Sequence, residues 1–279
     1  MGAPHGQHFL VNRGALATIL RRFAPLPGDR IVEIGPGRGA LTRDLLARAG
    51  ALAAVEIDRE LAAPLAAELG LPLLQEVGAG AGSPRPGFIL LADALDVRYA
   101  NLAASLGAGP ADRLRVIGNL PYSVATALLQ RMAAERDLIE DAMLMIQREV
   151  ADRILASPGS KTYGILSVLF ALVSERARIL SLGPRSFSPP PKVDSAVIGI
   201  RFRRPEPGFR DTDARLLALL KAAFSERRKK VAGNLAKRYA IDRARAAELL
   251  AAAGADPGAR AEQLTPEAYL RLAALLHAN

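Results

Sequence analysis

The 279-residue chain contains no cysteine. Disulfides, thiolate metal sites and a cysteine nucleophile are therefore excluded, and a chain that needs no oxidising compartment to fold is expected in the cytoplasm. No stretch of about 18 residues stays apolar, as a membrane-spanning helix would require. The first ten residues, MGAPHGQHFL, also lack the basic start and apolar stretch of a signal peptide. We therefore expect no membrane partner.

Acidic residues are fewer than basic ones, with 28 Asp and Glu against 37 Lys and Arg and a formal net charge of +9. Such a surplus favours a polyanionic partner such as nucleic acid, although many basic proteins bind none. Hydrophobic residues make up 50% and charged residues 23% of the chain, which is typical of a globular protein and not of a disordered one. This length is typical of one large domain or of a large domain with a small one, and the second arrangement is favoured.

Short apolar segments alternate with amphipathic stretches from Arg30 onward, a pattern typical of parallel strands joined by crossover helices. The predicted strands are Arg30–Ile34, Leu52–Ile57, Phe88–Ala92, Leu114–Gly118 and Ala142–Ile146. The predicted helices are Gly39–Ala49, Arg59–Leu69, Ser123–Ala134 and Arg148–Ser157. Two further segments, Arg178–Leu182 and Ser195–Phe202, should add an antiparallel pair at one edge. The predicted fold class is therefore α/β, with a doubly wound, Rossmann-like sheet.

Two segments rich in glycine and proline interrupt this pattern. GAGAGSPRPG at Gly78–Gly87 cannot hold a helix or strand and predicts a solvent loop. PEPG at Pro205–Gly208 ends the α/β pattern, and the remaining segments are predicted to be helical: Thr212–Phe224, Glu226–Arg238, Asp242–Ala253 and Pro266–His277. Thr265 should cap the last of these helices. We predict an α/β domain over residues 1–204 and a small helical domain over 205–279.

The first predicted strand enters its helix through a glycine-rich turn, Gly35-Pro36-Gly37-Arg38-Gly39. Glycines permit the sharp turn and let a ligand approach the backbone N–H groups at the carboxyl end of a strand. Glu56, beside Ile57, ends the second strand and can accept hydrogen bonds from both ribose hydroxyls of an adenosine cofactor. The glycine-rich turn resembles the first motif of class I S-adenosylmethionine methyltransferases, and this resemblance implies that Asp93, beside Ala94, accepts from an adenine amine. The same features fit a dinucleotide site, so an NAD-dependent oxidoreductase stays open.

The segment Asn119-Leu120-Pro121-Tyr122 follows the fourth predicted strand and resembles the N-[LIP]-P-[YF] motif of amino-methyltransferases that act on adenine N6. Adenine N6 is a poor nucleophile because its lone pair is delocalised into the ring. The Asn119 side-chain oxygen and the Leu120 carbonyl can accept its two hydrogens and localise that lone pair. Pro121 fixes the loop, and Tyr122 can stack on an extruded base. The resemblance therefore implies chemistry at adenine N6, and this chemistry needs no carboxylate or histidine base.

Together these motifs resemble the ribosomal RNA adenine dimethyltransferase family. Further segments carry the resemblance over nearly the whole chain: Gly6–Leu10, Met145–Val150, Ser160–Gly164, Phe187–Val197 and Phe224–Lys230. The resemblance implies S-adenosyl-L-methionine as methyl donor and S-adenosyl-L-homocysteine as product. It also implies dimethylation of N6 on two adjacent adenosines near the 3′ end of 16S rRNA, within an assembling small ribosomal subunit. We expect a monomer without a metal.

The resemblance also assigns roles to residues. Cofactor contacts fall on His8, Leu10, Gly35, Gly37, Glu56, Ile57, Asp93, Ala94 and Asn119. The residues expected to hold the reacting adenine are Asn119, Leu120, Pro121 and Tyr122. Phe187 is expected to form the opposite wall of the slot that receives this base. A set of basic residues, which we call the phosphate track, is expected to bind the phosphates of the RNA: Arg148, Arg153, Lys161, Arg227, Arg228, Lys229 and Lys230. His8 departs from the family, which usually has asparagine there, and Glu33 is expected to be structural or close to the methionine amine.

Two further alternatives stay open at this point. A 23S rRNA adenine-N6 methyltransferase of the macrolide-resistance type shares similar motifs and would act on protein-free 23S RNA. A non-catalytic assembly factor would bind RNA and S-adenosylmethionine without turnover. The intact Asn119–Tyr122 segment favours an enzyme over such a factor.

Overall fold

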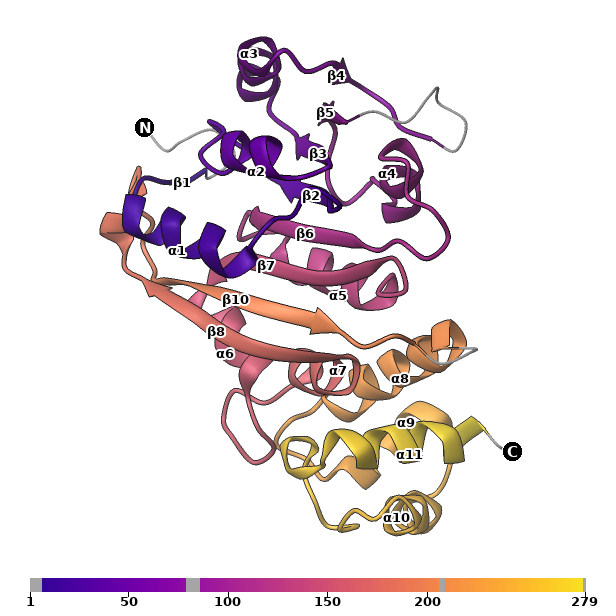
Figure 1. Cartoon of the computed structure of the whole chain (residues 1–279). Coiled ribbons are helices and arrows are strands. Elements are labelled where there is room, and N and C mark those ends of the chain that lie inside the picture. The colour runs from indigo at the N-terminus through magenta and orange to yellow at the C-terminus, as the bar shows by residue number, and fades with distance from the viewer. Residues whose placement is uncertain (1–6, 79–85, 206–208, 278–279) are drawn as a thin grey trace. The chain divides into compact units, whose positions relative to one another are not determined.

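The computed structural model describes residues 7–78, 86–205 and 209–277 (Figure 1). The chain divides into two compact units. The first unit comprises the described residues up to Ala151 together with Ala177–Phe202. The second unit comprises Asp152–Arg176 together with the described residues from Arg203 onward. Within the described ranges, none of the helices is long and apolar enough to cross a membrane.

An eight-stranded sheet organises the first unit, in the order β4-β5-β3-β2-β6-β7-β10-β8. Its strands are β2 (Arg30–Ile34), β3 (Ala51–Glu56), β4 (Leu73–Leu74), β5 (Gly87–Leu91), β6 (Leu114–Asn119), β7 (Ile139–Gln147), β8 (Ser174–Leu182) and β10 (Ser195–Phe202). Strands β2 to β7 pair in parallel, and β10 runs antiparallel to β7. The chain winds outward from β2 to β3 and β5, then returns to β6 on the other side of β2. The predicted doubly wound fold is confirmed, with its switch point between β2 and β6.

The helices of this unit are α1 (Arg13–Phe23), α2 (Thr42–Arg48), α3 (Arg59–Leu69), α4 (Tyr99–Ser105), α5 (Ala125–Ala134) and the start of α6 (Arg148–Leu155). Helix α1 was not predicted, although its signals are present in the sequence. The Asn12 side chain caps it by accepting from the Ala15 N–H at 3.0 Å. Its buried residues, among them Ile19 and Phe23, recur at helical spacing and pack in a core cluster that also contains residues of the sheet.

A second, two-stranded sheet joins segments far apart in the chain. Strand β1 (Phe9–Leu10) pairs antiparallel with β9 (Phe187–Ser188), which follows the single turn η2 (Pro184–Ser186). Leu10 and Phe187 are opposite partners, and both side chains are buried in the core of the unit. Strands of two residues leave no alternating pattern, so the sequence did not predict this pair.

The second unit is helical, as predicted for the C-terminal part of the chain. Its elements are α7 (Ile165–Val173), α8 (Phe209–Ala223), α9 (Val231–Tyr239), α10 (Arg243–Ala252), η3 (Ala261–Gln263) and α11 (Pro266–His277). Helix α9 begins at Val231 and not at the predicted Glu226. The buried Asn234 amide donates to the carbonyls of Ala223 and Glu226, which holds the turn between α8 and α9.

The predicted single boundary after residue 204 is wrong for residues 152–176, which belong to the second unit. Helix α7 packs against α8 and α11, and its Val168 is fully buried in their core cluster. The buried Tyr163 hydroxyl donates to the Leu264 carbonyl at 3.0 Å. Residues 152–176 therefore belong to the second unit because they share its apolar core, although they are closer in sequence to the first unit.

The two predicted breaks are described only in part. Residues 79–85 of the predicted solvent loop and residues 206–208 of the predicted interdomain break lie outside the described residues. The end of the predicted loop differs from expectation, because Gly87 is buried and opens β5.

Candidate active site

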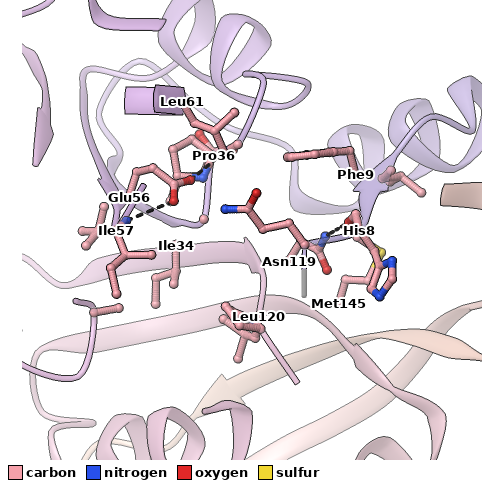
Figure 2. A pocket seen from close by; sticks show the side chains of 18 of the residues that line it. His8, Phe9, Ile34, Pro36, Glu56, Ile57, Leu61, Asn119, Leu120 and Met145 are labelled. Atoms are coloured by element: carbon pink, nitrogen blue, oxygen red, sulfur yellow. Dashed lines mark hydrogen bonds between the residues drawn. The ribbon is translucent and has the colours of Figure 1, made fainter. Parts of the chain in front are cut away.

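A cavity of about 470 Å³ lies at the carboxyl ends of the parallel strands of the first unit (Figure 2). The glycine-rich turn, the ends of β3, β5 and β6, and the N-terminal segment line it. Of the predicted cofactor and reaction residues, all but Phe187 are in this lining: His8, Leu10, Gly35, Gly37, Glu56, Ile57, Asp93, Ala94, Asn119, Leu120, Pro121 and Tyr122. The structure therefore brings together residues that lie more than one hundred positions apart, such as His8 and Asn119, which are 111 apart.

The glycine-rich turn depends on backbone conformations and close approaches that favour glycine. Gly35 and Gly37 have φ values of 68° and 55°, in the left-handed region. A Cβ on Gly35 would lie 3.2 Å from the Asn119 carbonyl oxygen, and one on Gly37 would lie 3.0 Å from the Phe9 ring. The turn can thus contact two other segments of the lining because it has no side chain at these positions.

Glu56 is held at the end of β3 by backbone N–H groups. Its Oε2 accepts from Gly37 N at 3.0 Å, and its Oε1 accepts from Ile57 N at 3.0 Å and Asp58 N at 3.1 Å. Burial raises the pKa of Glu56, and these N–H donors oppose that shift. A carboxylate has about four acceptor sites, so the side chain is fixed while it retains capacity for a ligand hydroxyl.

Glu33 lies in the same lining and is 2% exposed. Its Oε2 has no hydrogen-bond partner among the described residues. The pKa of Glu33 is raised from 4.5 to about 7, chiefly by burial, with Thr42 opposing the rise and the nearby Glu56 adding to it. A buried carboxyl group without a partner at one oxygen is suited to a cationic or hydrogen-donating ligand group.

Asp93 follows β5, at the edge of the cavity. Its Oδ1 accepts from Leu95 N at 2.8 Å, which closes a turn. Ala94 and the half-exposed Ile57 line the cavity as apolar neighbours, and Ile57 is 49% exposed. This part of the cavity combines a carboxylate edge with apolar surface, as the recognition of a planar, amine-bearing ring requires.

Asn119 ends β6, and its side chain has a defined orientation. Its Nδ2 donates to the His8 carbonyl oxygen at 2.8 Å (Figure 2). Because a carbonyl can only accept, the nitrogen of the amide must face His8, and Oδ1 is the acceptor left for another group. The next residue, Leu120, is 1% exposed and donates its N–H to the Met145 carbonyl at 3.0 Å. Pro121 then accepts from the backbone N–H groups that begin α5.

Tyr122 and His8 contribute neighbouring rings to the lining, with centroids 5.9 Å apart and planes tilted by 33°. The Tyr122 hydroxyl and the buried Ser195 hydroxyl are 2.8 Å apart and share a hydrogen bond. His8 Nδ1 lies 2.8 Å from the Pro189 carbonyl oxygen. The His8 ring is thereby attached to the loop that follows β9, and the Tyr122 ring to the first residue of β10.

Phe187 does not lie where the sequence predicted it. Its side chain is 4% exposed, belongs to the core cluster and does not line the cavity. Antiparallel partners place their side chains on the same side of a sheet, so Phe187 points inward with its partner Leu10. The next residue, Ser188, is in the lining instead.

Several lining residues were missed as functional residues. Gln7 Nε2 donates to Asp58 Oδ2 at 3.2 Å. Phe9 lies against the Arg38 guanidinium, whose carbon is 4.7 Å from the ring centroid. Met145 lines the cavity from β7. Gln7 and Phe9 stand beside His8 in the Gly6–Leu10 motif, which was the available signal, whereas nothing in the sequence pairs Tyr122 with Ser195.

The predicted phosphate track consists of exposed basic side chains: Arg148, Arg153, Lys161, Arg227, Arg228, Lys229 and Lys230. In the first unit, Arg148 forms an ion pair with Asp194 at 2.5 Å. In the second unit, the Arg227 guanidinium donates to the carbonyls of Lys161 and Tyr163 at 3.0 and 3.1 Å. The structure therefore brings Arg227 and Lys161 together. Among the described residues, no group of His, Asp and Glu is arranged to hold a metal ion.

Comparison with known proteins adds to this geometry. A family model described as ribosomal RNA adenine dimethylase matches residues 3–278. The chain belongs to the ribosomal RNA adenine dimethylase family. Two relatives named ribosomal RNA small subunit methyltransferase A are similar over nearly their whole length. The protein from Anaeromyxobacter sp. (strain K) is 40% identical over 93% of this chain and 88% of its own, and that from Hydrogenovibrio crunogenus is 38% identical over 98% and 95%.

Solved structures of similar fold confirm the Rossmann-like assignment for this family member. A dimethyladenosine transferase from Plasmodium falciparum aligns with a TM-score of 0.75 at 23% identity, over 95% of this chain and 96% of its own. The 23S rRNA methyltransferase ErmE aligns with a TM-score of 0.65 at 27% identity, over 96% and 99%.

Proposed function

We propose that this family member is an S-adenosylmethionine-dependent 16S rRNA adenine-N6 dimethyltransferase, acting on two adjacent adenosines near the 3′ end of small-subunit rRNA. The observation that carries the proposal is the Asn119 amide, held with its oxygen free to accept, next to the Leu120 carbonyl and the Tyr122 ring. The relatives named small subunit methyltransferase A support the choice of 16S rRNA as substrate.

The residues of the cavity fit the proposed cofactor. The buried Oε2 of Glu33 has no hydrogen-bond partner within the described part of the chain and suits the ammonium group of the methionine part. Glu56 would accept from the ribose hydroxyls, and Asp93 would accept from the adenine amine beside Ile57. The remaining contacts would come from His8, Leu10, Gly35, Gly37, Ala94 and Asn119. When bound, the cofactor supplies a methyl group on a positively charged sulfur.

The chain's own part in the reaction is to hold the adenine amine. Asn119 Oδ1 and the Leu120 carbonyl would accept the two N6 hydrogens, which localises the nitrogen lone pair for attack. Tyr122, anchored through Ser195, would stack on the extruded base. The amine loses its proton once it has gained a methyl group, so no side-chain base is required. Phe187 would support this site from the core.

Exposed basic side chains would hold the rRNA through its phosphates. Arg227, with its guanidinium on the Lys161 and Tyr163 carbonyls, would lie in this track with Arg228, Lys229 and Lys230. Phosphate contacts position an enzyme without reading sequence, so the choice of adenosines would depend on the folded RNA.

The proposal is tested by methyl transfer from radiolabelled S-adenosylmethionine to small ribosomal subunits from a strain that lacks the modification. Protein-free 23S rRNA serves as the parallel substrate. Nuclease digestion and mass spectrometry then identify the labelled nucleoside. We expect N6,N6-dimethyladenosine with the small subunits only.

Other outcomes would replace the proposal with a specific alternative. Label in 23S rRNA would indicate the resistance-type enzyme and would agree with the likeness to ErmE, which is named a 23S rRNA methyltransferase. Cofactor binding without label in either RNA would indicate a non-catalytic assembly factor. Binding of a nicotinamide cofactor without retention on immobilised S-adenosylhomocysteine would indicate an oxidoreductase.

A further inference from the structure

The N-terminal segment Gln7–Leu10, which we call the strap, connects distant parts of the cavity lining. Gln7 at its start donates to Asp58, the N-cap of α3, at 3.2 Å. Its last two residues pair with Phe187 and Ser188 in the two-stranded sheet. Between these attachments, the His8 carbonyl accepts from Asn119 Nδ2 at 2.8 Å (Figure 2).

We propose that the strap is a positioning element, in which the His8 carbonyl orients the Asn119 amide so that Oδ1 faces the substrate amine. This inference rests on the proposed function, because it assigns Asn119 as the acceptor of an N6 hydrogen. The two ends of a carboxamide are nearly equal in shape but opposite in hydrogen bonding. If the Asn119 amide were reversed, its Nδ2 group would face the substrate amine, and both groups are hydrogen-bond donors. Activity therefore requires that the orientation with Oδ1 toward the amine dominate.

The His8 carbonyl can select that orientation because it only accepts hydrogen bonds. A reversed Asn119 amide would place Oδ1 against the carbonyl oxygen, which leaves both groups without a donor. Asn119 is partly buried at this point, so water cannot freely replace the missing partner. The selection therefore depends on where the His8 carbonyl is held.

The His8 side chain provides that attachment. Its Nδ1 lies 2.8 Å from the Pro189 carbonyl, which requires the proton on Nδ1, and its ring lies beside Tyr122. An asparagine side chain also carries an N–H donor, so it can replace the imidazole as a tether to the Pro189 carbonyl.

His8→Ala removes the tether and tests the inference. With saturating cofactor and small subunits, we expect kcat to fall by about 10- to 100-fold, since a displaced acceptor costs this much when binding is intact. The donor-bearing variant His8→Asn should recover most of the loss. Asn12→Ala is the matched control, because it removes the cap of α1 two residues beyond the strap and leaves His8 and Asn119 untouched. It should lower Tm without lowering kcat.

A second measurement does not depend on the substrate. In protein labelled with ¹⁵N-asparagine, the side-chain resonance of Asn119 is identified by its absence in Asn119→Ala. Its hydrogens should exchange with solvent faster in His8→Ala than in the wild type, and at the wild-type rate in Asn12→Ala. Unchanged exchange or unchanged kcat in His8→Ala would overturn the inference, as would an equal loss of kcat in Asn12→Ala. Absence of dimethyladenosine with the wild type would instead overturn the proposed function, and the exchange measurement would still decide the role of the strap.

Discussion

The cavity lining of the first unit and the basic run Arg227–Lys230 of the second hold their side chains in different ways. Glu33 and Glu56 are 2% and 5% exposed, and Glu56 accepts from three backbone N–H groups. Lys229, by contrast, is 66% exposed and pairs with Glu226, three residues before it. The cavity groups are fixed by buried contacts between distant segments, whereas the four basic side chains are exposed to solvent.

This difference follows from what each region is proposed to do. Orientation of a reacting amine fails when an acceptor moves by about 1 Å, so such a group needs several attachments. Attraction of phosphate acts over a Debye length of about 8 Å, so a basic side chain needs only to be near its partner. We therefore expect a single substitution in the cavity to lower activity more than a single substitution in the basic run does.

The largest effect is expected for Asn119→Ala. Loss of an oriented acceptor should lower kcat by about 100- to 1,000-fold, as removal of one such group does in other enzymes. Binding to small subunits, measured by filter retention, should stay close to that of the wild type. If turnover and RNA binding fell together, Asn119 would be a structural residue, and the contrast between the regions would disappear.

Glu33→Gln should reveal the cost of the buried carboxyl group. Burial raises the pKa of Glu33 to about 7 from 4.5 in the unfolded chain. Near pH 4 the Glu33 carboxyl is mostly protonated in both the folded and the unfolded protein, so its burial lowers the free energy of unfolding only a little. As pH rises to 7 the unfolded state ionises first, so the folded state loses stability, by about 3 kcal/mol once pH exceeds 7.

The measurement is urea unfolding of both proteins between pH 4 and 8. The free energy of unfolding of Glu33→Gln should exceed that of the wild type by up to this amount at pH 8 and be close to it near pH 4. A constant difference across the range would show that Glu33 does not titrate between the two states. The variant should also bind S-adenosylhomocysteine more weakly, if Glu33 accepts from the ammonium group.

Neutralisation of Arg228, Lys229 and Lys230 to glutamine should weaken binding to rRNA without lowering kcat at saturating substrate. Removal of each side chain that binds a phosphate should reduce the slope of log affinity against log salt concentration by about 1. Arg227→Gln is the informative comparison, because it also breaks hydrogen bonds to the Lys161 and Tyr163 carbonyls and should lower Tm. An unchanged salt slope in the triple variant would remove these residues from the RNA surface.

The smallest effect is expected at a helix end that belongs to neither the cavity lining nor the basic run. The Thr265 hydroxyl oxygen accepts from Ala268 N at 3.2 Å and caps α11. Thr265→Ala should lower the free energy of unfolding by about 1 kcal/mol, and kcat should not change. Asp242→Ala, which removes the equivalent cap of α10, provides a second case. A loss of activity in either variant would mean that the helical unit contributes to turnover directly.

The elements that the sequence predicted best have strong local signals. Residues 30–34, 59–69 and 266–277 form β2, α3 and α11 with the predicted bounds. Helix α3 begins after the capping Asp58, ends at Gly70 in the left-handed conformation and has buried positions at helical spacing. Such signals depend only on nearby residues. Helix α7 has an apolar sequence nearly throughout, ILSVLFALV, so periodicity could not distinguish a buried helix from a buried strand.

The candidate site was predictable as a set of residues but not as an arrangement. Strand ends at the same edge of a parallel sheet must lie close together, so Gly35, Glu56, Asp93 and Asn119 could be grouped from the order of the elements. The bond from Asn119 to the His8 carbonyl could not be predicted, because a main-chain acceptor carries no residue-type signal. Phe187 was misplaced for a related reason, since its inward direction is set by pairing with Leu10.

The sequence by itself thus determined most of the strands and helices, the doubly wound class of the sheet and the chemical groups available at its carboxyl edge. Periodicity, caps and short motifs encode these features over a few residues. The tertiary structure alone decided the unit to which residues 152–176 belong, the direction of the Phe187 side chain and the orientation of the Asn119 amide. These depend on contacts between segments far apart in the chain, which form only when a common core places them together.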